Sequence, residues 1–170
     1  MGGYKVRTIT REELDEILIN HQHWLAEDCD NWENMRADLS NADLSNANLS
    51  NANLWNAVNI SYIPLACPDT GGFIAWKKAH HHIVKLFVSP CAKRVSATTR
   101  KCRCNRAYVI AIENMDGTIS DIVRIESDYN YNFVYEVGKI VEEKEFDENR
   151  WNECSKGIHF FINRQEAVDY

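Results

Sequence analysis

Apolar residues recur with a five-residue period between residues 37 and 61. A small residue alternates with a larger one, at Ala37, Ala42, Ala47, Ala52 and Ala57, and at Leu39, Leu44, Leu49 and Leu54. This period fits neither an α-helix nor a β-strand. It fits a solenoid in which each side of a coil is one pentapeptide, with alanine and leucine inside and polar residues outside. The stretch predicts about one coil, which is too little to bury a core without neighbouring elements.

The units that begin at Ala37, Ala42, Ala47 and Ala52 read Ala-(Asp or Asn)-Leu followed by two further residues. This pattern resembles the pentapeptide-repeat family, and the resemblance implies a right-handed β-solenoid. Larger members of that family mimic DNA and protect gyrase with a long acidic rod of many coils. We do not expect that activity from about one coil.

A helix is predicted before the repeats, over residues 10–27. Thr10 and Glu13 have the spacing of a capping box, and one helical face is apolar apart from a histidine, with Leu14, Ile17, Leu18, His21 and Leu25. We expect this helix to cover the open end of the coil, because the terminal repeat would otherwise leave its stacking face in water. Helix and coil together make the first predicted domain, residues 1–63.

A second domain is predicted over residues 64–170, because Pro64 and Pro68 end the repeat. Short apolar or alternating runs, separated by turn signals such as Asp116-Gly117, predict strands. These runs are Ile83–Val88, Ala107–Ile112, Ile119–Ile125, Phe133–Val137 and Gly157–Ile162.

Two short helices complete the prediction, over Phe73–Ala79 and from Asn163 to Tyr170, the second with Ala167 and Tyr170 turned inward. The expected fold class is mainly β. It comprises an N-terminal capping helix, about one coil of right-handed pentapeptide-repeat β-solenoid, and a mixed, mainly-β domain with a short C-terminal helix.

The net charge of −6 conceals a basic segment, residues 70–112, which contains no aspartate or glutamate. It contains Lys77, Lys78, Lys85, Lys93, Arg94, Arg100, Lys101, Arg103 and Arg106, together with His80, His81 and His82. Because the rest of the chain is rich in acids, the segment predicts a basic surface or pocket.

The Lys93–Arg103 cluster has the chemistry of an anion site. Arginine offers a planar fork to phosphate or carboxylate, lysine adds a point charge, and hydroxyl groups add neutral hydrogen bonds. A solvated basic face is the plainer alternative. The candidate ligand-binding residues are Lys77, Lys78, Lys93, Arg94, Ser96, Thr98, Arg100, Lys101, Arg103 and His159.

The cysteines show no Cys-x-x-Cys pair and no regular disulfide spacing, so they are expected to be free. A thiolate near a cation is activated, which makes Cys102 or Cys154 with His159 a formal nucleophile–base pair. Cys102, Cys104, Cys154 and His159 would make a Cys3His zinc set, but their spacing is not that of usual zinc sites. A buried structural role is the main expectation for these residues, so no metal and no cofactor are predicted.

The second domain carries further motifs beyond the repeats. They are Pro68, Gly72–Lys78, Ala92–Arg94, Ser96–Thr98, Arg100–Arg103, Tyr135-x-Val137-Gly138, Phe146-Asp147 and Cys154-x-x-Gly157–Phe161. With these motifs, residues 64–170 resemble a domain of unknown function that follows pentapeptide repeats in proteins of phages and gut bacteria. That family brings no established reaction, so the resemblance implies a phage or prophage setting rather than a mechanism.

The sequence favours a non-enzymatic binding protein with a basic pocket for a small phosphorylated or nucleotide-like ligand. In a phage, such a pocket would serve counter-defence by sequestering a nucleotide immune signal of the host. Two alternatives remain open. The repeat coil is an interaction module for a host or phage protein, or His159 with a cysteine makes the chain an enzyme that acts on a nucleotide.

The overall negative charge disfavours nucleic acid as a partner. No signal peptide or bilayer-spanning run is visible, which indicates a cytoplasmic protein without a membrane partner. Self-association stays open, because no motif specifies it.

Overall fold

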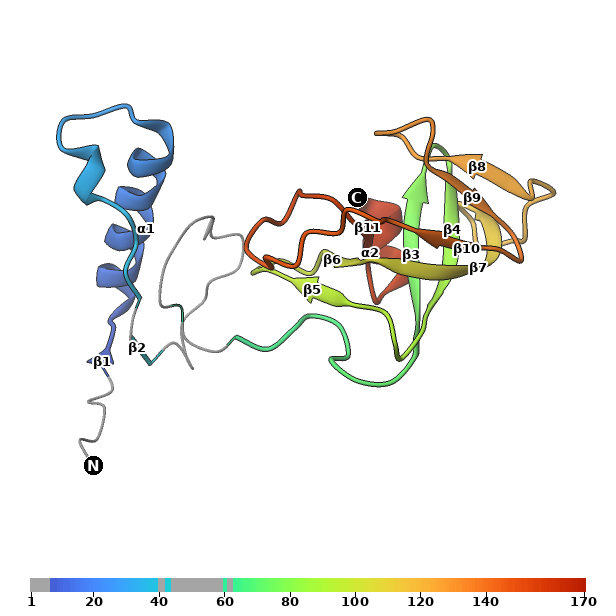
Figure 1. Cartoon of the computed structure of the whole chain (residues 1–170), viewed down its shortest axis with the longest axis horizontal. Helices are drawn as coiled ribbons and strands as arrows, with labels where there is room; N and C mark the ends of the chain where they lie inside the picture. The colour runs from blue at the N-terminus through green and yellow to red at the C-terminus, as the bar shows by residue number, and fades with distance from the viewer. Residues whose placement is uncertain (1–6, 40–41, 44–59, 61–62) are drawn as a thin grey trace. The chain divides into compact units, whose positions relative to one another are not determined.

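The computed structural model describes residues 7–39, 42–43, 60 and 63–170. The chain divides into two compact units, Met1–Pro64 and Leu65–Tyr170 (Figure 1). The division lies one residue from the expected boundary after residue 63. Within the described residues, no helix has both the length and the apolar character that crossing a bilayer requires.

One long helix dominates the described part of the first unit. Its predicted capping box is confirmed, because Glu13 N–H donates to Thr10 Oγ1 over 3.2 Å and Thr10 N–H donates to Glu13 Oε2 over 2.9 Å. Leu14 and His21 are its buried residues. The elements of this unit are β1 (Arg7–Thr8), α1 (Arg11–Ala26), the 3₁₀ helix η1 (Trp32–Asn34) and β2 (Ala42–Asp43).

The first repeat is tied to the helix. Ala37 N–H donates to the Nδ1 atom of the buried His21 over 3.3 Å, and Ala37 and Leu39 are buried, as their inward positions predict. Strand β1 pairs in parallel with β2 of the second repeat. Residues 44–59 lie outside the described residues, and with them the predicted coil and its handedness.

Antiparallel sheets build the second unit. Their strand orders are β10-β7-β4-β3, β11-β6-β5 and β8-β9. A bridge joins the first two sheets, because Trp76 N–H donates to Phe161 O over 2.9 Å and Phe161 N–H donates to Trp76 O over 2.8 Å. The elements are β3 (Phe73–Ala79), β4 (His82–Val88), β5 (Arg94–Ser96), β6 (Cys102–Cys104), β7 (Arg106–Asn114), β8 (Arg124–Glu126), β9 (Val134–Glu136), β10 (Ile140–Glu142), β11 (Ile158–Phe160) and α2 (Arg164–Asp169).

Most predicted strands are present, but the predicted helix over Phe73–Ala79 is wrong. This segment is β3, which pairs with the whole of β4. Its alternation is hidden in the sequence because the core face carries Ala75, Lys77 and Ala79, two small residues around a charged one. The run Ile119–Ile125 is also shorter than predicted, since its strand, β8, begins only at Arg124.

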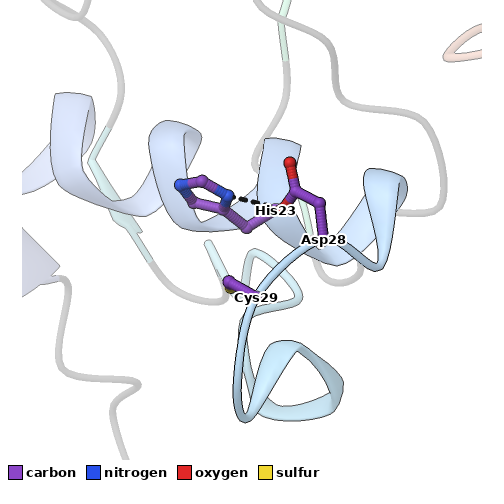
Figure 2. Close-up of side chains that lie close together, drawn as sticks. All are labelled: His23, Asp28 and Cys29. Carbon is purple, nitrogen blue, oxygen red and sulfur yellow. Dashed lines mark hydrogen bonds and ion pairs between the residues drawn. The ribbon is translucent and has the colours of Figure 1, made fainter.

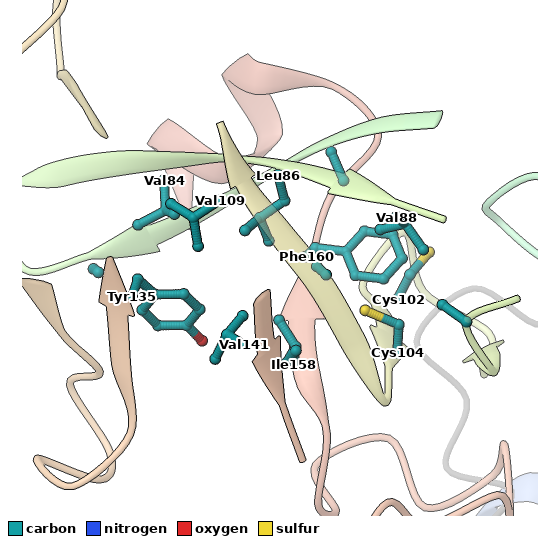
Figure 3. Packing of buried hydrophobic residues seen from close by; sticks show 14 of the residues in the cluster. Val84, Leu86, Val88, Cys102, Cys104, Val109, Tyr135, Val141, Ile158 and Phe160 are labelled. Atoms are coloured by element: carbon teal, nitrogen blue, oxygen red, sulfur yellow. The ribbon is translucent and has the colours of Figure 1, made fainter. Parts of the chain in front are cut away.

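The core of the second unit lies where side chains from β4 and β7 meet those of β6, β9, β10 and β11 (Figure 3). The alternation along β4 buries Val84, Leu86 and Val88, and Phe160 of β11 reaches the same cluster. The short strands each contribute one or two residues, so the core is assembled from many separate segments.

Helix α2 packs on a second, smaller cluster formed by Ile83, Phe161 and Ala167. Asn163 caps it, since Gln165 N–H donates to the Asn163 Oδ1 atom over 2.8 Å. Ala167 is fully buried as predicted, whereas the inward placement of Tyr170 is wrong, because Tyr170 is 57% exposed. Tyr170 lies at the edge of the cluster, with its ring against that of Phe161.

Candidate functional site

Three arginines of the basic segment, Arg94, Arg100 and Arg103, bind other parts of the chain. Arg94 Nη1 donates to Gly71 O over 2.8 Å, and its Nη2 donates to Ser89 O over 2.7 Å. Its guanidinium also lies over the ring of Phe73, 5.1 Å from the centroid. Arg94 therefore ties the loops that flank β3 and β4 together.

Arg103 has the same function deeper in the unit, where it is only 2% exposed. Its Nη1 donates to Lys156 O over 2.7 Å and to Asp147 O over 3.0 Å, and its Nη2 donates to Asn149 O over 3.0 Å. Because three backbone carbonyls use its donors, Arg103 fastens the long connection between β10 and β11 onto β6. Arg103 lines neither of the two spaces described below.

Other predicted ligand residues also have partners within the chain. Lys93 pairs with Glu148, Arg100 pairs with Glu166, and Lys78 Nζ donates to Val168 O over 3.0 Å. The Ser96 hydroxyl accepts from Ala66 N–H over 2.8 Å. Thr98 is half-buried in the connection between β5 and β6.

A cavity of about 440 Å³ brings together three of the predicted ligand residues, Lys77, Lys101 and His159. An adjoining hollow of about 430 Å³ shares Lys77 and His159 and adds Lys78. The remaining residues of the predicted set do not line either space. The structure therefore concentrates the candidate site on two lysines, with Lys78 beside it, rather than on the arginines.

Strand alternation explains how two of these side chains reach the cavity. Lys77 follows Ala75 on the core-facing side of β3 and lies at the end of the core, with its Nζ 5.9 Å from the ring centroid of Tyr135. His159 lies between the fully buried Ile158 and Phe160 on β11, so its imidazole faces the opposite side of the strand from the core. Its Nε2 hydrogen-bonds to Ser155 O at 3.0 Å.

Aromatic rings form much of the remaining wall, together with polar residues that include Glu143 and Lys156. Tyr135 is 1% exposed, whereas Tyr129 and Tyr170 stand at the rim. Lys101 Nζ lies 5.5 Å from the ring centroid of Tyr170. Sequence reasoning did not assign these rings to the site. The alternating aromatics of the stretch from Tyr129 to Tyr135 were the available signal, but a sheet core explains such a pattern equally well.

Burial controls the charge of the cavity. It is the main cause that brings the pKa of Lys77 down to about 8, a shift that Asp128 opposes and the charge of Lys101 reinforces. Burial is also the main cause that lowers the pKa of His159 to about 4. The nearby cations add to this lowering, whereas the hydrogen bond with Ser155 O acts to raise the pKa. At neutral pH, the imidazole is therefore uncharged and Lys77 carries a proton that it holds weakly.

Lys101 keeps its charge more firmly. Burial lowers the pKa of Lys101, but Tyr170, Cys154 and Glu153 together raise it above its ordinary value. Its Nζ lies 3.4 Å from Cys154 Sγ and 4.0 Å from a carboxylate oxygen of Glu153. Lys77, by contrast, forms no ion pair with any acidic residue that the structure describes.

The candidate nucleophiles lie in different environments. Cys102 is in the core, where a hydrogen bond with Cys67 and burial raise the pKa of its thiol far above the ordinary range. Cys154 is exposed and lines the cavity with His159, but the two side chains are not hydrogen-bonded to each other. Cys102, Cys104, Cys154 and His159 do not assemble into a group with metal-binding distances.

Two family models match the chain. Residues 36–58 match pentapeptide repeats, and residues 63–167 match a family of unknown function, DUF5758. Comparisons with curated proteins and with solved structures found no match. The pentapeptide resemblance and the following domain of unknown function are thus confirmed, and neither model supplies a reaction.

Replacing Arg103 with lysine should destabilise the protein strongly. A single ammonium group cannot reach three carbonyl oxygens that lie around a planar fork, and buried carbonyls then lose their donors. We expect Arg103→Lys to lower the free energy of unfolding by about 3 kcal/mol in urea titrations. Arg124→Lys, at an exposed arginine, is the matched control and should change little. Equal stability of the two variants would contradict the role of Arg103 as a clamp that fastens the connection between β10 and β11 onto β6.

The buried His159 should make stability depend on pH in acid. Its pKa of about 4 in the folded protein lies below the ordinary 6.5, so the unfolded chain binds the proton more tightly. The stabilisation is fully present above pH 6.5 and is lost as pH falls towards 4, by at most about 3 kcal/mol. Urea titrations at several pH values should therefore show that the free energy of unfolding falls more steeply for the wild type than for His159→Gln between pH 6.5 and 4. Parallel curves would contradict this account.

Proposed function

The chain belongs to DUF5758, a family of unknown function, and we propose that the cavity around Lys77 binds a small phosphorylated or nucleotide-like anion. The environment of the Lys77 ammonium group is the main support for this proposal. This group lies half-buried at the wall of a cavity of about 440 Å³, over an aromatic ring and without an ion pair among the described acids.

A desolvated ammonium group without a carboxylate partner is unfavourable, and its lowered pKa expresses this. An anionic ligand would supply the missing charge and raise that pKa. Lys101 adds a second ammonium group to the same wall, with a pKa that keeps it charged. Two cations in one partly enclosed space suit phosphate oxygens, because each ammonium group is a compact point charge with several donors.

The rings around the lysines suit a planar group on the same ligand. Tyr129 and Tyr170 at the rim and Phe133 and Tyr135 deeper inside provide apolar faces next to the charge. Aromatic faces stack on nucleobases without strong sequence preference. The volume is within the range of small-molecule sites, which is about 300–1,000 Å³. These features favour a mononucleotide or a cyclic nucleotide over inorganic phosphate.

The proposed role is binding without turnover. His159 is neutral and its Nε2 is engaged with Ser155 O, and Cys154 contacts Lys101 instead of the imidazole. We further propose that the protein acts in a phage or prophage. There the cavity would sequester a nucleotide signal of the host.

The variant Lys77→Met separates the site from the fold. Methionine has a similar length and no charge, so removing the partly desolvated ammonium group should leave the free energy of unfolding unchanged or higher, while ligand binding weakens. Isothermal titration of the wild type with a panel of mononucleotides and cyclic nucleotides should give binding that Lys77→Met weakens at least tenfold. Lys144→Met, at an exposed lysine, is the matched control and should bind like the wild type.

The affinity should also fall as pH rises past about 8, the pKa of Lys77. About one tenth of the amine keeps its proton one pH unit above its pKa, so binding at pH 9 should be up to about tenfold weaker than at pH 7. The corresponding profile of Lys77→Met should be flat. An absence of binding across the panel at high micromolar concentration, or binding that Lys77→Met leaves intact, would refute the proposed function.

A further inference from the structure

A second group of chemically active side chains lies in the first unit, at the C-terminal end of α1 (Figure 2). His23 belongs to the last turn of the helix, and Asp28 and Cys29 follow it. Glu27, with a left-handed φ of 52°, reverses the chain between them. The reversal brings the carboxylate and the thiol of the loop back to the imidazole.

The distances within this group are short. His23 Nδ1 lies 2.7 Å from Asp28 Oδ1, and one ligand atom from each of His23, Asp28 and Cys29 lies within 4.8 Å of the others. The Cys29 thiol also contacts the thioether of Met35, with 3.6 Å between the sulfur atoms. Ligand atoms of a tetrahedral zinc ion are roughly 3.5 Å apart, and the separations of 2.7 Å and of up to 4.8 Å lie on either side of that spacing.

We propose that His23, Asp28 and Cys29 bind one thiophilic divalent cation of the zinc type, with the fourth position open to water. Nitrogen, carboxylate and thiolate are the ligand types that zinc takes in proteins, and three protein ligands with an open position are a common arrangement. This site differs from the Cys3His set considered in the sequence, and it uses none of the residues of the Lys77 cavity.

The surroundings suit a cation. Asp30 and Glu33, with Glu27, line the hollow of about 400 Å³ next to Cys29. Their negative charge attracts a divalent ion. A hydrogen bond that only orients the end of α1 would explain why His23 lies next to Asp28. It would not explain why the thiol of Cys29 and the thioether of Met35 lie beside this pair.

Partial burial and the charges of Asp28, Asp30 and Glu33 raise the pKa of the Cys29 thiol. A bound cation would displace the thiol proton, so metal binding should release protons and should strengthen as pH rises. This behaviour distinguishes coordination by the thiolate from a cation held loosely among carboxylates.

Cobalt(II) titration of the untagged full-length chain tests the site, because cobalt reports thiolate coordination by absorption in the near ultraviolet. We expect one equivalent to bind with a thiolate-to-cobalt band, and zinc to displace it. Cys29→Ser should abolish the band and weaken binding at least tenfold. Cys91→Ser, at an exposed cysteine of the other unit, is the matched control and should retain both.

Further variants distinguish the proposed ligands from neighbouring carboxylates and from other histidines. Asp28→Asn should weaken binding about tenfold or more, whereas Asp30→Asn, in the same loop, should have a smaller effect. His81→Gln interrupts the histidine triplet of the second unit and should leave the band unchanged. In the wild type, zinc should protect Cys29 from alkylation by iodoacetamide in peptide mass spectrometry, a measurement that requires no variant.

The absence of a cobalt band at equimolar metal, a band that survives in Cys29→Ser, or alkylation of Cys29 that zinc does not slow would each overturn the proposal. None of these results bears on nucleotide binding, because the two sets of residues lie in different units of the chain.

Discussion

Guanidinium groups that donate to backbone carbonyl oxygens hold the second unit together. Its strands β5, β6 and β8 to β11 are each three residues long, so much of the backbone lies in connections outside the sheet ladders. The long connections between them carry carbonyl groups that need donors when they are buried. Arg94 and Arg103 supply several donors each, and Arg164 does the same at the turn after β7, where its Nη2 donates to Asn114 O over 2.7 Å. Arginine suits this function because its donors form a rigid fork.

This use of arginine changes the meaning of the basic segment. A stretch without acids suggests a surface that attracts anions. However, Arg94 and Arg103 donate to backbone carbonyl oxygens of the chain. Lys93 and Arg100 pair with acids from other segments. The acid-free composition is consistent with this packing, since the acidic partners of the segment lie later in the sequence. Of the charged residues in this segment, Lys77 and Lys101 line the cavity, and the composition does not distinguish them from the rest.

The proposed anion cavity and the proposed cation site follow from opposite electrostatic environments. Around Lys77, burial among aromatic rings disfavours the proton on the amine, so a negative ligand stabilises the charged form. Around Cys29, burial and nearby carboxylates disfavour the thiolate, so a positive ion stabilises it. In both places the protein holds a group whose charged form lacks a sufficient partner within the described residues, and the sign of that charge indicates the class of ligand.

The sequence by itself determined the features that depend on neighbours a few residues apart. The capping box of Thr10 and Glu13, the cap at Asn163, the strand β4 and the pentapeptide repeats could all be predicted, because each rests on local hydrogen bonds or on a short period. The tertiary structure alone decided that Phe73–Ala79 is a strand, since β4 and the core select its conformation. It also decided that Arg103 is a clamp and Lys77 a cavity residue. Pairing across 44 residues or more, as between Arg103 and Asp147, depends on how separate segments pack, and no periodicity in the chain encodes it.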